Sequence, residues 1–371
     1  SSAASDVYKR QLKIGGQEKV GKEIGLHIDR NKYEIHYLVF DENKEAYEQE
    51  LSAVGIKVFH LPEPSSGYIQ YLKNLYTLMN ENSYDIVHAH TMFNCGWAML
   101  LAWYMKVPCR ISHSHSIKMA GYHYSKLTII YQFVMRMLIH ICGTEYIGCG
   151  KAAGEWLYGK RFFEKHGKVV YNGIDTGMFR FSSVKREQMR QQLGLEDKFV
   201  IGHVGHFQKV KNQQFLISLM PEILKRRQNA VLLLLGDGEL REENWNYCKE
   251  LGIEDQVLMV GNVENVADYL CAMDVFAFPS LYEGMPLSVI EVQCNGLPCV
   301  ISDSVPDDVF LTDLVRPLSV NESKEKWADE ICGAKRENEL QYSEMIKKTG
   351  FDTSEMLRNI YDIYDSVPER K

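Results

Sequence analysis

Two carboxylates, Glu283 and Glu291, stand eight positions apart in the segment PSLYEGMPLSVIE. Between them, Gly284 allows a ligand to approach the backbone closely, and Pro286 suits the first turn of a helix, where no N–H donor is needed. The free amides of such a turn attract an anion such as a diphosphate. A carboxylate farther along the helix can accept paired hydrogen bonds from vicinal hydroxyls, as on a ribose. The segment therefore predicts a site for a sugar-linked anion; the alternative is one glutamate that complements the helix dipole and one that faces solvent.

Two further glycine turns follow apolar runs in the same half of the chain. Gly205 follows FVIGHV, with Lys209 and Lys211 shortly after it, and the turn Gly236–Gly238 follows VLLLL. A lysine ammonium is a compact charge that suits phosphate oxygens, although a solvated helix start would explain the lysines as well. Because turns that follow parallel strands share one edge of the sheet, we expect these turns and the glutamate segment to converge on one ligand.

The first half of the chain offers histidines in place of lysines. The pair Gly15–Gly16 opens a helical pattern, and two histidine pairs follow predicted strands, His88 with His90 and His113 with His115. Residues i and i+2 of a strand face the same way, so each pair could hold a metal ion, line a sugar or phosphate pocket, or pack in the core. A pair lacks the third ligand and the carboxylate support that are typical of metal sites. We therefore expect no metal here and favour a pocket.

Alternating strands and helices must position these turns. Short apolar runs alternate with helical patterns along the chain, which is typical of parallel, doubly wound sheets in an α/β fold. Strands are expected in the first half at 34–40, 57–61, 86–89, 109–112 and 145–149, and in the second half at 199–204, 231–235, 257–260, 275–278, 298–302 and 315–318.

The length of 371 residues suits two domains rather than one core. The turn signal Asn172–Gly173 and the polar stretch that follows it mark a crossing. We place the first domain at 1–170 and the second at 171–350. The last segment, 351–371, carries an apolar stripe at helical spacing, so we expect a helix there that packs back on the first domain.

The first residues do not fit this scheme. The segment DVYKRQ, at 6–11, is similar to the translation of a transposon adapter used in sequencing libraries. We therefore expect residues 1–11 to be non-native. The first strand of the first domain is then expected to be truncated, with Leu12–Ile14 as its remaining tail.

Composition excludes several functional classes. An apolar fraction of 45% with 25% charged residues is typical of a soluble globular protein, and a net charge of −7 argues against general nucleic-acid binding. No run of 18 apolar residues could cross a bilayer. The nine cysteines are odd in number and never form a CxxC pair, so we expect small buried hydrophobes in a reducing compartment rather than disulfides or a zinc finger.

The charge is unevenly distributed. Between residues 104 and 170 there are ten Lys or Arg against three Glu, and an amphipathic pattern runs over 127–141 within this region. Two interpretations stay open: the helix lies on a membrane surface beside an anionic acceptor, or its apolar face packs in the core. In the second case the core-facing side chains are Ile129, Phe133, Met137 and Ile141.

Together these motifs make the chain similar to the retaining glycosyltransferases of family 4, most of all the bacterial enzymes of exopolysaccharide and capsule assembly. The matching pieces are IGGQEK, YDIVHAH, VPCRISHSHS, KAAGEWLYG, VVYNGID, VGHFQKVKN, LLGDGEL and AMDVFAFPSLYEGMPLSVIEVQCNGLPCV. The Glu-x7-Glu pattern is the most specific of them. The resemblance implies a GT-B fold, in which two Rossmann-like, doubly wound domains face a cleft and the second holds a nucleotide-sugar donor, with no resident cofactor and no obligatory metal.

The resemblance also assigns roles. Glu283 would contact the donor sugar, Glu291 the ribose, and Lys211 the diphosphate. His113, or His115 if the register shifts, would hydrogen-bond the sugar; the catalytic candidates are Glu283, His113 and Lys211. The donor-binding candidates are Gly15, Gly16, Gly205, His206, Lys211, Gly236, Asp237, Gly284, Met285, Pro286, Leu287 and Glu291, and the acceptor-side candidates are His90 and His115. Family members often carry arginine at the position of His206, so diphosphate binding here leans on Lys211.

The implied activity is transfer of a sugar, with retention, from a nucleotide-diphosphate sugar to a hydroxyl of a lipid-linked saccharide in cell-surface polysaccharide synthesis. The expected location is the cytoplasm, at the inner face of the membrane. We find no second carboxylate placed to act as a covalent nucleophile, so attack from the same face is expected, with the leaving phosphate taking the proton. The alternatives are a nucleotide-sugar 2-epimerase on the same fold and a non-catalytic nucleotide-sugar-binding subunit.

Overall fold

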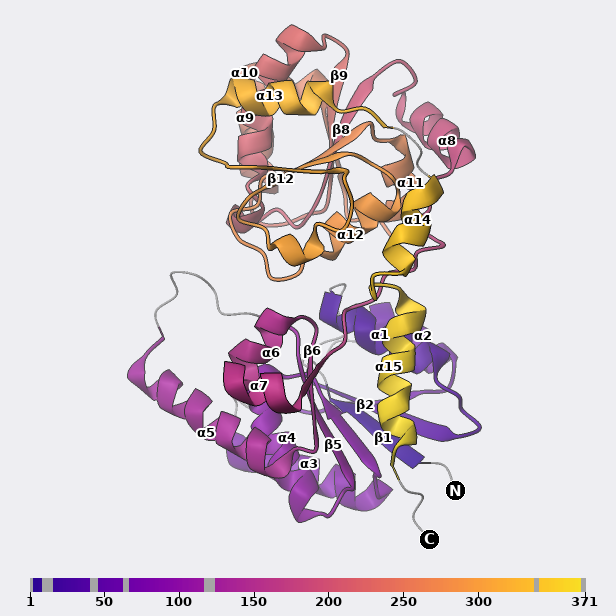
Figure 1. The fold of residues 1–371 in the computed structure, drawn as a ribbon, viewed down its shortest axis with the longest axis vertical. Coiled ribbons are helices and arrows are strands. Elements are labelled where there is room, and N and C mark those ends of the chain that lie inside the picture. Colours follow the sequence, from indigo (N-terminus) through magenta and orange to yellow (C-terminus); the bar gives the residue numbers. More distant parts are fainter. Residues whose placement is uncertain are drawn as a thin grey trace. The chain divides into compact units, whose positions relative to one another are not determined.

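Two parallel sheets organise the chain, one in each half of its sequence (Figure 1). The computed structural model describes residues 3–8, 16–40, 46–62, 67–116, 124–336 and 340–367. Contacts divide the chain into two units: the first contains Ser1–Gly173 and Thr353–Lys371, and the second contains Ile174–Asp352. The chain therefore leaves the first unit after Gly173 and returns to it after Asp352.

The first sheet has seven strands in the order β3-β2-β1-β4-β5-β6-β7, all parallel to their neighbours. The strands are β1 (Ala3–Tyr8), β2 (Tyr33–Val39), β3 (Lys57–His60), β4 (Ile86–Ala89), β5 (Cys109–Ser114), β6 (Glu145–Gly148) and β7 (Gly167–Val169). Because the chain runs outward in one direction from β1 and in the other from β4, the sheet is doubly wound.

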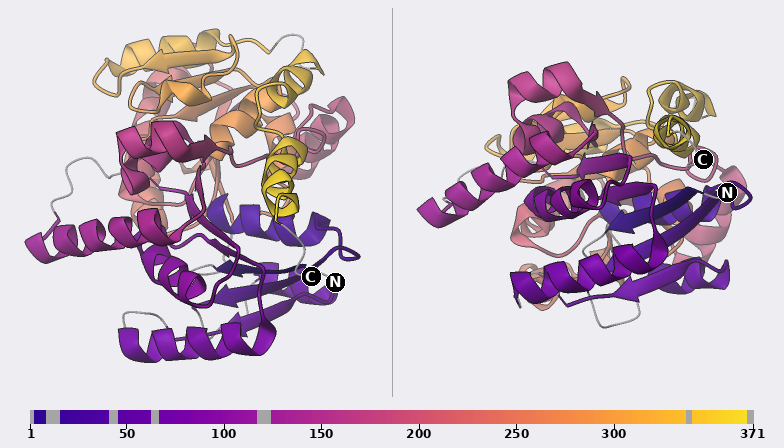
Figure 2. Two further views of the ribbon diagram at one scale, coloured as in Figure 1. Left: turned by 60° about the horizontal axis from the view of Figure 1, so that its bottom comes forward. Right: turned by 90° about the horizontal axis from the view of Figure 1, so that it is seen from below.

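Helices cover both faces of the first sheet. They are α1 (Gly16–His27), α2 (Ala46–Ala53), α3 (Tyr68–Asn82), α4 (Cys95–Tyr104), α5 (Lys126–Cys142), α6 (Lys151–Tyr158), α7 (Lys160–His166) and α15 (Thr353–Asp365). The buried side chains of α1, α2 and α15 form one hydrophobic cluster, and those of α3 to α7 form another. The last helix, yellow in Figures 1 and 2, thus belongs to the first unit, and Tyr361 Oη donates a hydrogen bond to the Ile24 carbonyl at 2.9 Å.

The second sheet has six parallel strands in the order β10-β9-β8-β11-β12-β13. The strands are β8 (Phe199–Val204), β9 (Ala230–Leu235), β10 (Val257–Gly261), β11 (Val275–Phe278), β12 (Cys299–Ser302) and β13 (Val315–Leu318). The helices are α8 (Ser183–Leu193), α9 (Gln213–Arg226), α10 (Arg241–Leu251), α11 (Val266–Ala272), α12 (Leu287–Cys294), α13 (Lys324–Gly333) and α14 (Leu340–Lys347). Side chains of α9, α10 and α13 share one buried cluster with the sheet.

No strand was expected from the sequence at residues 3–8, and the structure has one there. Ala3–Tyr8 forms β1, which lies between β2 and β4 and pairs with both; Ser5, for example, is in register with Ile35 and Ile86. Ladder hydrogen bonds use backbone groups, which every residue except proline offers in full, so six residues can complete a parallel sheet when strands on both sides supply partners. The tail expected at residues 12–14 lies outside the described residues.

The other expected strands are confirmed, with ends that differ by at most two residues. The sequence did not predict β7, because three residues at the edge of a sheet are too few to show a period. The apolar stripe of the last helix is also confirmed. Its buried members are Met356, Leu357, Ile360, Ile363 and Tyr364.

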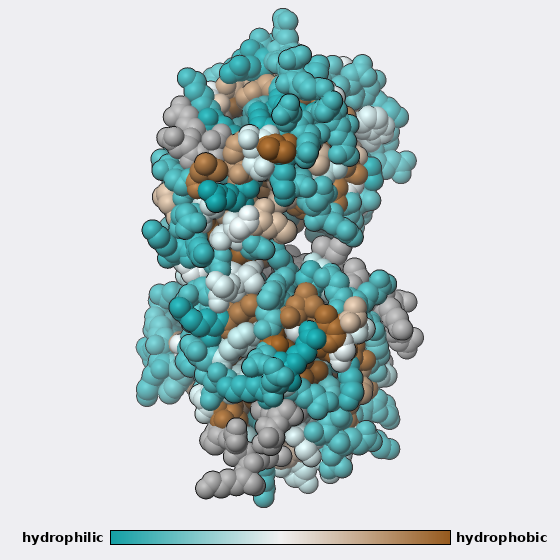
Figure 3. All heavy atoms as spheres, turned by 90° about the vertical axis from the view of Figure 1, so that its right-hand side faces the viewer, coloured by the Kyte–Doolittle hydropathy of each residue, from teal (hydrophilic) through white to brown (hydrophobic). Residues whose placement is uncertain are grey.

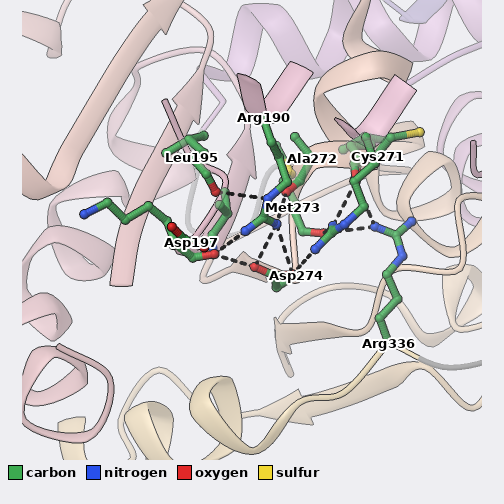
Figure 4. A network of polar contacts seen from close by, with 12 residues as sticks. Arg190, Leu195, Asp197, Cys271, Ala272, Met273, Asp274 and Arg336 are labelled. Atoms are coloured by element: carbon green, nitrogen blue, oxygen red, sulfur yellow. Dashed lines mark hydrogen bonds and ion pairs between the residues drawn. The ribbon is translucent and has the colours of Figure 1, made fainter. Parts of the chain in front are cut away.

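Three arginines and one aspartate join the amino-terminal ends of β8 and β11 (Figure 4). Asp274, just before β11, accepts a hydrogen bond from the Val200 amide of β8 at 2.8 Å. Its carboxylate also contacts Arg186 at 2.5 Å and Arg190 at 3.3 Å, both from α8. Arg336 donates to the carbonyl that precedes Asp274, at 2.9 Å. The network thus fixes these two strands at the end opposite to the turns predicted to bind a ligand.

The burial of the cysteines and the polarity of the surface match the expectations drawn from the composition. Eight of the nine cysteines are buried, all nine are free, and burial raises the pKa of Cys109, Cys149 and Cys294 to about 12. The face in Figure 3 is mostly hydrophilic, with hydrophobic side chains in separate small groups. Among the described residues, no helix is long and apolar enough to cross a membrane.

Candidate active site

The three predicted turns follow adjacent strands of the second sheet. Strands β9, β8 and β11 are neighbours, and the strand order reverses between β8 and β11. In open parallel sheets, ligands bind beyond the carboxyl ends of the strands at such a reversal. The turn after β8 carries Gly205 to Lys211, and the turn after β11 carries Glu283. Both therefore lie at the reversal point.

An ion pair joins these two turns. Lys211 Nζ lies 2.7 Å from Glu283 Oε1, and both side chains are largely buried. The ammonium also lies 4.9 Å from the centroid of the Phe278 ring. The backbones of the turns are tied as well, because the Leu281 amide donates to the Val210 carbonyl at 2.8 Å. A charged, hydrogen-bonded pair in a site of restricted solvent access interacts more strongly than the same pair at the surface.

The turn after β9 presses against the turn after β8. Gly236 has a φ of +126°, and a Cβ on it would lie 2.2 Å from the Gly205 carbonyl oxygen, so a side chain is excluded there. The Phe207 amide donates to the Asp237 carbonyl at 2.9 Å. The Asp237 carboxylate accepts from the Gly238 amide at 2.8 Å, so it shapes its own turn. The structure thus brings the three predicted turns together.

The segment that carries Gly284 and Met285 leads into α12. Pro286 occupies the N-cap position rather than the first helical turn, and Leu287 is the first helical residue. Glu291 is the fifth residue of this helix and is half-buried. The Val289 amide donates to the Pro286 carbonyl at 3.0 Å, so the first-turn amides left for a ligand or solvent are those of Leu287 and Ser288.

In the first unit, the four predicted histidines meet at the carboxyl ends of β4 and β5. His88 Nε2 lies 3.2 Å from His113 Nδ1, and His90 Nδ1 lies 2.7 Å from His115 Nε2. The rings of His113 and His115 stack with centroids 4.1 Å apart. Only His115 of the four is partly exposed; the other three are buried. The alternative residue, His115, is therefore more accessible to a ligand than His113.

The objection that a metal site would lack a third ligand is wrong. Because β4 and β5 are adjacent, His88, His90 and His113 can each offer one nitrogen, and these atoms lie within 4.8 Å of one another. His88 Nδ1 shares a hydrogen bond of 2.8 Å with the hydroxyl of Tyr364 on α15. The three histidines are thus the group in the described chain that could hold a transition metal.

The remaining glycine candidates lie at the start of the first helix. Gly16 is the first residue of α1, which follows β1, and Gly15 lies outside the described residues. His206, in the turn after β8, is exposed. It therefore offers its ring to solvent rather than to the ion pair.

Sequence reasoning missed two buried residues beneath the ion pair. His203 on β8 donates through Nδ1 to the Ala277 carbonyl at 3.0 Å, and burial, together with the charge of Lys211, lowers its pKa to about 4. Gln213, the first residue of α9, donates to the His206 carbonyl at 3.0 Å. Both residues stand inside an apolar strand or helical pattern, and only the partners given by the tertiary structure reveal that they support the turn.

Comparison with known proteins decides the family. The model of Glycosyltransferase Family 4 matches residues 14–177, and that of Glycosyl transferases group 1 matches residues 185–356. EpsF of Bacillus subtilis, named as a glycosyltransferase, is 30% identical over 366 residues, which cover 96% of this chain and 94% of that protein. This chain is a glycosyltransferase of family 4. Its activity belongs to polysaccharide biosynthesis.

Other relatives of this glycosyltransferase agree with that assignment. The capsular polysaccharide biosynthesis glycosyltransferase CapH of Staphylococcus aureus is 26% identical and covers 75% of each chain. The UDP-Gal:alpha-D-GlcNAc-diphosphoundecaprenol alpha-1,3-galactosyltransferase of Escherichia coli is 29% identical over 62% of this chain and 61% of that enzyme. The UDP complex of HepE from Anabaena superposes with a TM-score of 0.80 at 20% identity, covering 98% of this chain and 100% of that one. The glycosyltransferase therefore has the expected GT-B fold, which is confirmed.

Proposed function

We propose that this glycosyltransferase transfers a sugar from a nucleotide-diphosphate sugar to a hydroxyl of a lipid-linked saccharide, with retention of the anomeric configuration. The observation that carries the proposal is the pair of Lys211 and Glu283 at the reversal point of the second sheet, 2.7 Å apart. One group carries the positive charge that a diphosphate needs, and the other carries the negative charge that a cationic sugar needs.

The mechanism follows from where charge develops. When the bond between the anomeric carbon and the diphosphate breaks, negative charge grows on the leaving oxygen, and Lys211 with the amides before α12 stabilises it. The carbon gains oxocarbenium character, which Glu283 stabilises. The acceptor hydroxyl attacks from the face that the diphosphate leaves, and the departing phosphate oxygen takes the hydroxyl proton. No resident metal or cofactor takes part in this scheme.

Two findings support the donor and acceptor classes. HepE is described in complex with UDP, and the E. coli relative carries the name of an enzyme that uses a UDP-sugar and a diphosphoundecaprenol-linked acceptor. Within this chain, Glu291 lies one helical turn beyond Leu287, where its carboxylate would accept the ribose hydroxyls. His115, the partly exposed histidine of the first unit, is the candidate for binding an acceptor hydroxyl. We place the reaction on the cytoplasmic side of the membrane, where nucleotide sugars are made.

A donor screen followed by a transfer assay tests the proposal. The full chain is scanned for thermal stabilisation by UDP-, GDP- and ADP-sugars; a donor at 100 times its dissociation constant should stabilise by about 2.7 kcal/mol. The stabilising donor is then incubated with a lipid-diphosphate-linked saccharide, with and without EDTA, and the product linkage is read by NMR. An α-linked product from an α-linked donor, formed equally with EDTA, is expected. An inverted product would overturn retention, and loss of activity in EDTA would overturn metal independence.

The same incubation separates the alternatives. A 2-epimerase would convert the donor in the absence of acceptor. A non-catalytic binding subunit would be stabilised by the donor but would form no product. Glu283→Ala serves as the control, because transfer that survives this substitution unchanged would contradict the role given to Glu283.

A further inference from the structure

Four imidazole rings pack together at the carboxyl ends of two neighbouring strands of the first unit. His88 lies on β4 and His90 follows it, while His113 lies on β5 and His115 follows that strand. The centroids of neighbouring rings are between 4.1 and 5.3 Å apart. Because the neutral imidazole is the commonest protein ligand for metal ions, a group of this kind can bind an ion as well as a hydroxyl.

The spacing of the nitrogen atoms suits a small ion. His88 Nε2 lies 3.2 Å from His113 Nδ1, and one nitrogen each of His88, His90 and His113 lies within 4.8 Å of the other two. A tetrahedral Zn²⁺ holds imidazole nitrogens at about 2.1 Å, which places the nitrogens about 3.4 Å from one another. The first two nitrogens already have that spacing. A rotation about the last side-chain torsion of His90, which is soft in histidine, brings in the third.

The partners of the other ring nitrogens also suit metal binding. A histidine ligand presents a lone pair on one nitrogen and donates the proton of the other to a neighbouring group. His88 Nδ1 lies 2.8 Å from the hydroxyl of Tyr364, and His90 Nδ1 lies 2.7 Å from His115 Nε2. Protons placed on these two Nδ1 atoms leave Nε2 of His88 and of His90 with lone pairs. His113 presents Nδ1 when its proton is on Nε2. Three lone pairs are therefore available without any residue having to ionise.

The chemistry of this ligand set selects the class of ion. All three ligands are neutral nitrogens, which suit Zn²⁺, Cu²⁺ and Ni²⁺, whereas Mg²⁺ and Ca²⁺ require oxygen ligands. The side chains of His88, His90 and His113 are each at most 1% exposed, and the partly exposed His115 is where the group meets solvent. The group thus offers an enclosed site to a borderline transition metal.

We propose that His88, His90 and His113 form a binding site for a divalent transition-metal ion such as Zn²⁺, and that the filled site inhibits sugar transfer. The reaction scheme itself needs no metal, so the metal-free chain is the active form. An ion at this site takes the lone pairs through which His90 and His113 would accept a hydrogen bond from a substrate hydroxyl. The inhibition rests on the proposed function, whereas the binding of the ion does not.

Titration of the metal-free full chain with Co²⁺ alone tests the site. Co²⁺ held by three imidazoles in a four-coordinate site absorbs visible light far more strongly than hydrated Co²⁺, so absorption reports the ligand set directly. Wild type should bind one Co²⁺ with intense bands. The control His27→Gln removes an exposed histidine from α1, in the same unit, and should behave as wild type.

Two variants then remove different parts of the site. His90→Gln removes a ligand and should abolish the intense bands. Tyr364→Phe keeps all three ligands and removes only the hydroxyl that holds the proton of His88, so it should bind Co²⁺ about ten- to a hundredfold more weakly. Circular dichroism checks that each variant is folded, and Tyr364→Phe still tests the site if His90→Gln does not fold. Weak bands in wild type, bands of full strength in a folded His90→Gln, or unchanged affinity in Tyr364→Phe would overturn the proposal.

Inhibition is measured by adding Zn²⁺ to the transfer reaction. Transfer by wild type should stop as the site fills and recover fully in excess EDTA. Tyr364→Phe should require more Zn²⁺, in the ratio by which its affinity for Co²⁺ falls. Transfer that is unchanged or accelerated when the site is filled would overturn the inhibition. If metal-free wild type transfers no sugar at all, the proposed function fails, and the Co²⁺ titration, which uses no substrate, still decides whether the histidines bind an ion.

Discussion

The carboxyl ends of the two sheets have the same topology but opposite chemistry. In the second unit, the strand reversal carries a charged pair, Lys211 and Glu283, and glycine turns that let backbones meet. In the first unit, the carboxyl ends of β4 and β5 carry four imidazoles that contact one another and the hydroxyl of Tyr364. Charged groups favour a charged ligand, whereas imidazoles can exchange hydrogen bonds with hydroxyls.

The difference matches the two binding tasks of the proposed transfer reaction. A diphosphate must be bound and its developing charge stabilised, which requires fixed charges and free amides. A sugar hydroxyl needs acceptors and donors of hydrogen bonds without a net charge. Four substitutions test this contrast, and they are given from the largest expected effect to the smallest.

Removing the lysine charge from the candidate site of the second unit should have the largest effect on the rate of transfer. Lys211→Ala is expected to lower the rate of transfer about a hundred- to a thousandfold, because the charge proposed to stabilise the leaving diphosphate is lost. The matched control is Lys209→Ala, which removes an exposed lysine from the same turn and should change the rate less than twofold. Steady-state kinetics with donor and acceptor varied separately provide the measurement. Equal losses in both variants would contradict a specific role for Lys211.

Acidification should weaken the second unit through His203. Its pKa in the folded state is about 4, against about 6.5 when unfolded, so the unfolded state binds the proton more readily. The contribution of His203 to the free energy of unfolding is complete above pH 6.5. It falls by about 3 kcal/mol as the pH approaches 4. Urea unfolding at pH 7 and pH 4.5 should show a smaller loss for His203→Phe than for wild type. The exposed His206→Gln should keep the wild-type loss, and an unchanged loss in His203→Phe would refute this account.

A side chain at the glycine contact should separate the turns of the second unit. Gly236→Ala must relieve a contact of 2.2 Å with Gly205 at a positive φ, so we expect a loss of about 2 kcal/mol in unfolding free energy and weaker donor binding. Gly252→Ala also has a positive φ but no heavy atom within 4 Å, so it should lose about 1 kcal/mol and keep donor affinity. Calorimetric titration with the donor distinguishes the two. Normal donor binding by Gly236→Ala would show that the turns can separate without any loss of donor affinity.

The smallest effect is expected in the first unit. Tyr364→Phe removes the hydroxyl that is hydrogen-bonded to His88, which should lower the free energy of unfolding by about 1 kcal/mol. The control Tyr361→Phe, on the same helix as Tyr364, removes a similar hydrogen bond, which Tyr361 donates to the Ile24 carbonyl. It should lower the free energy of unfolding by about as much. Only Tyr364→Phe should shift the imidazole NMR signals of the histidine group. A shift in both variants would mean that the helix moves as a whole.

Most of the fold was predictable because strands and helices leave a local period. Both sheets, α9 and the buried stripe of α15 follow from patterns within ten or fifteen residues. Strand β1 was not predicted because the segment was judged by its origin rather than by its backbone, and β7 was not predicted because it is three residues long. The glycine turns and the glutamate pair were predictable because each follows a strand at a short, fixed distance.

The sequence by itself determined which residue types end each strand, and therefore that one half of the chain would present lysine and glutamate and the other half histidine. The tertiary structure decided which of them meet. Lys211 and Glu283 are 72 residues apart, and His88 and Tyr364 are 276 apart, and each pair is joined by strand order or by a returning helix. It also decided that α5 buries three side chains and leaves seven large apolar ones exposed. The interpretation that four of these seven face the core is therefore wrong: Ile129, Phe133, Met137 and Ile141. Periodicity records which residues share a face of an element, but not what that face contacts, because packing partners come from distant parts of the chain.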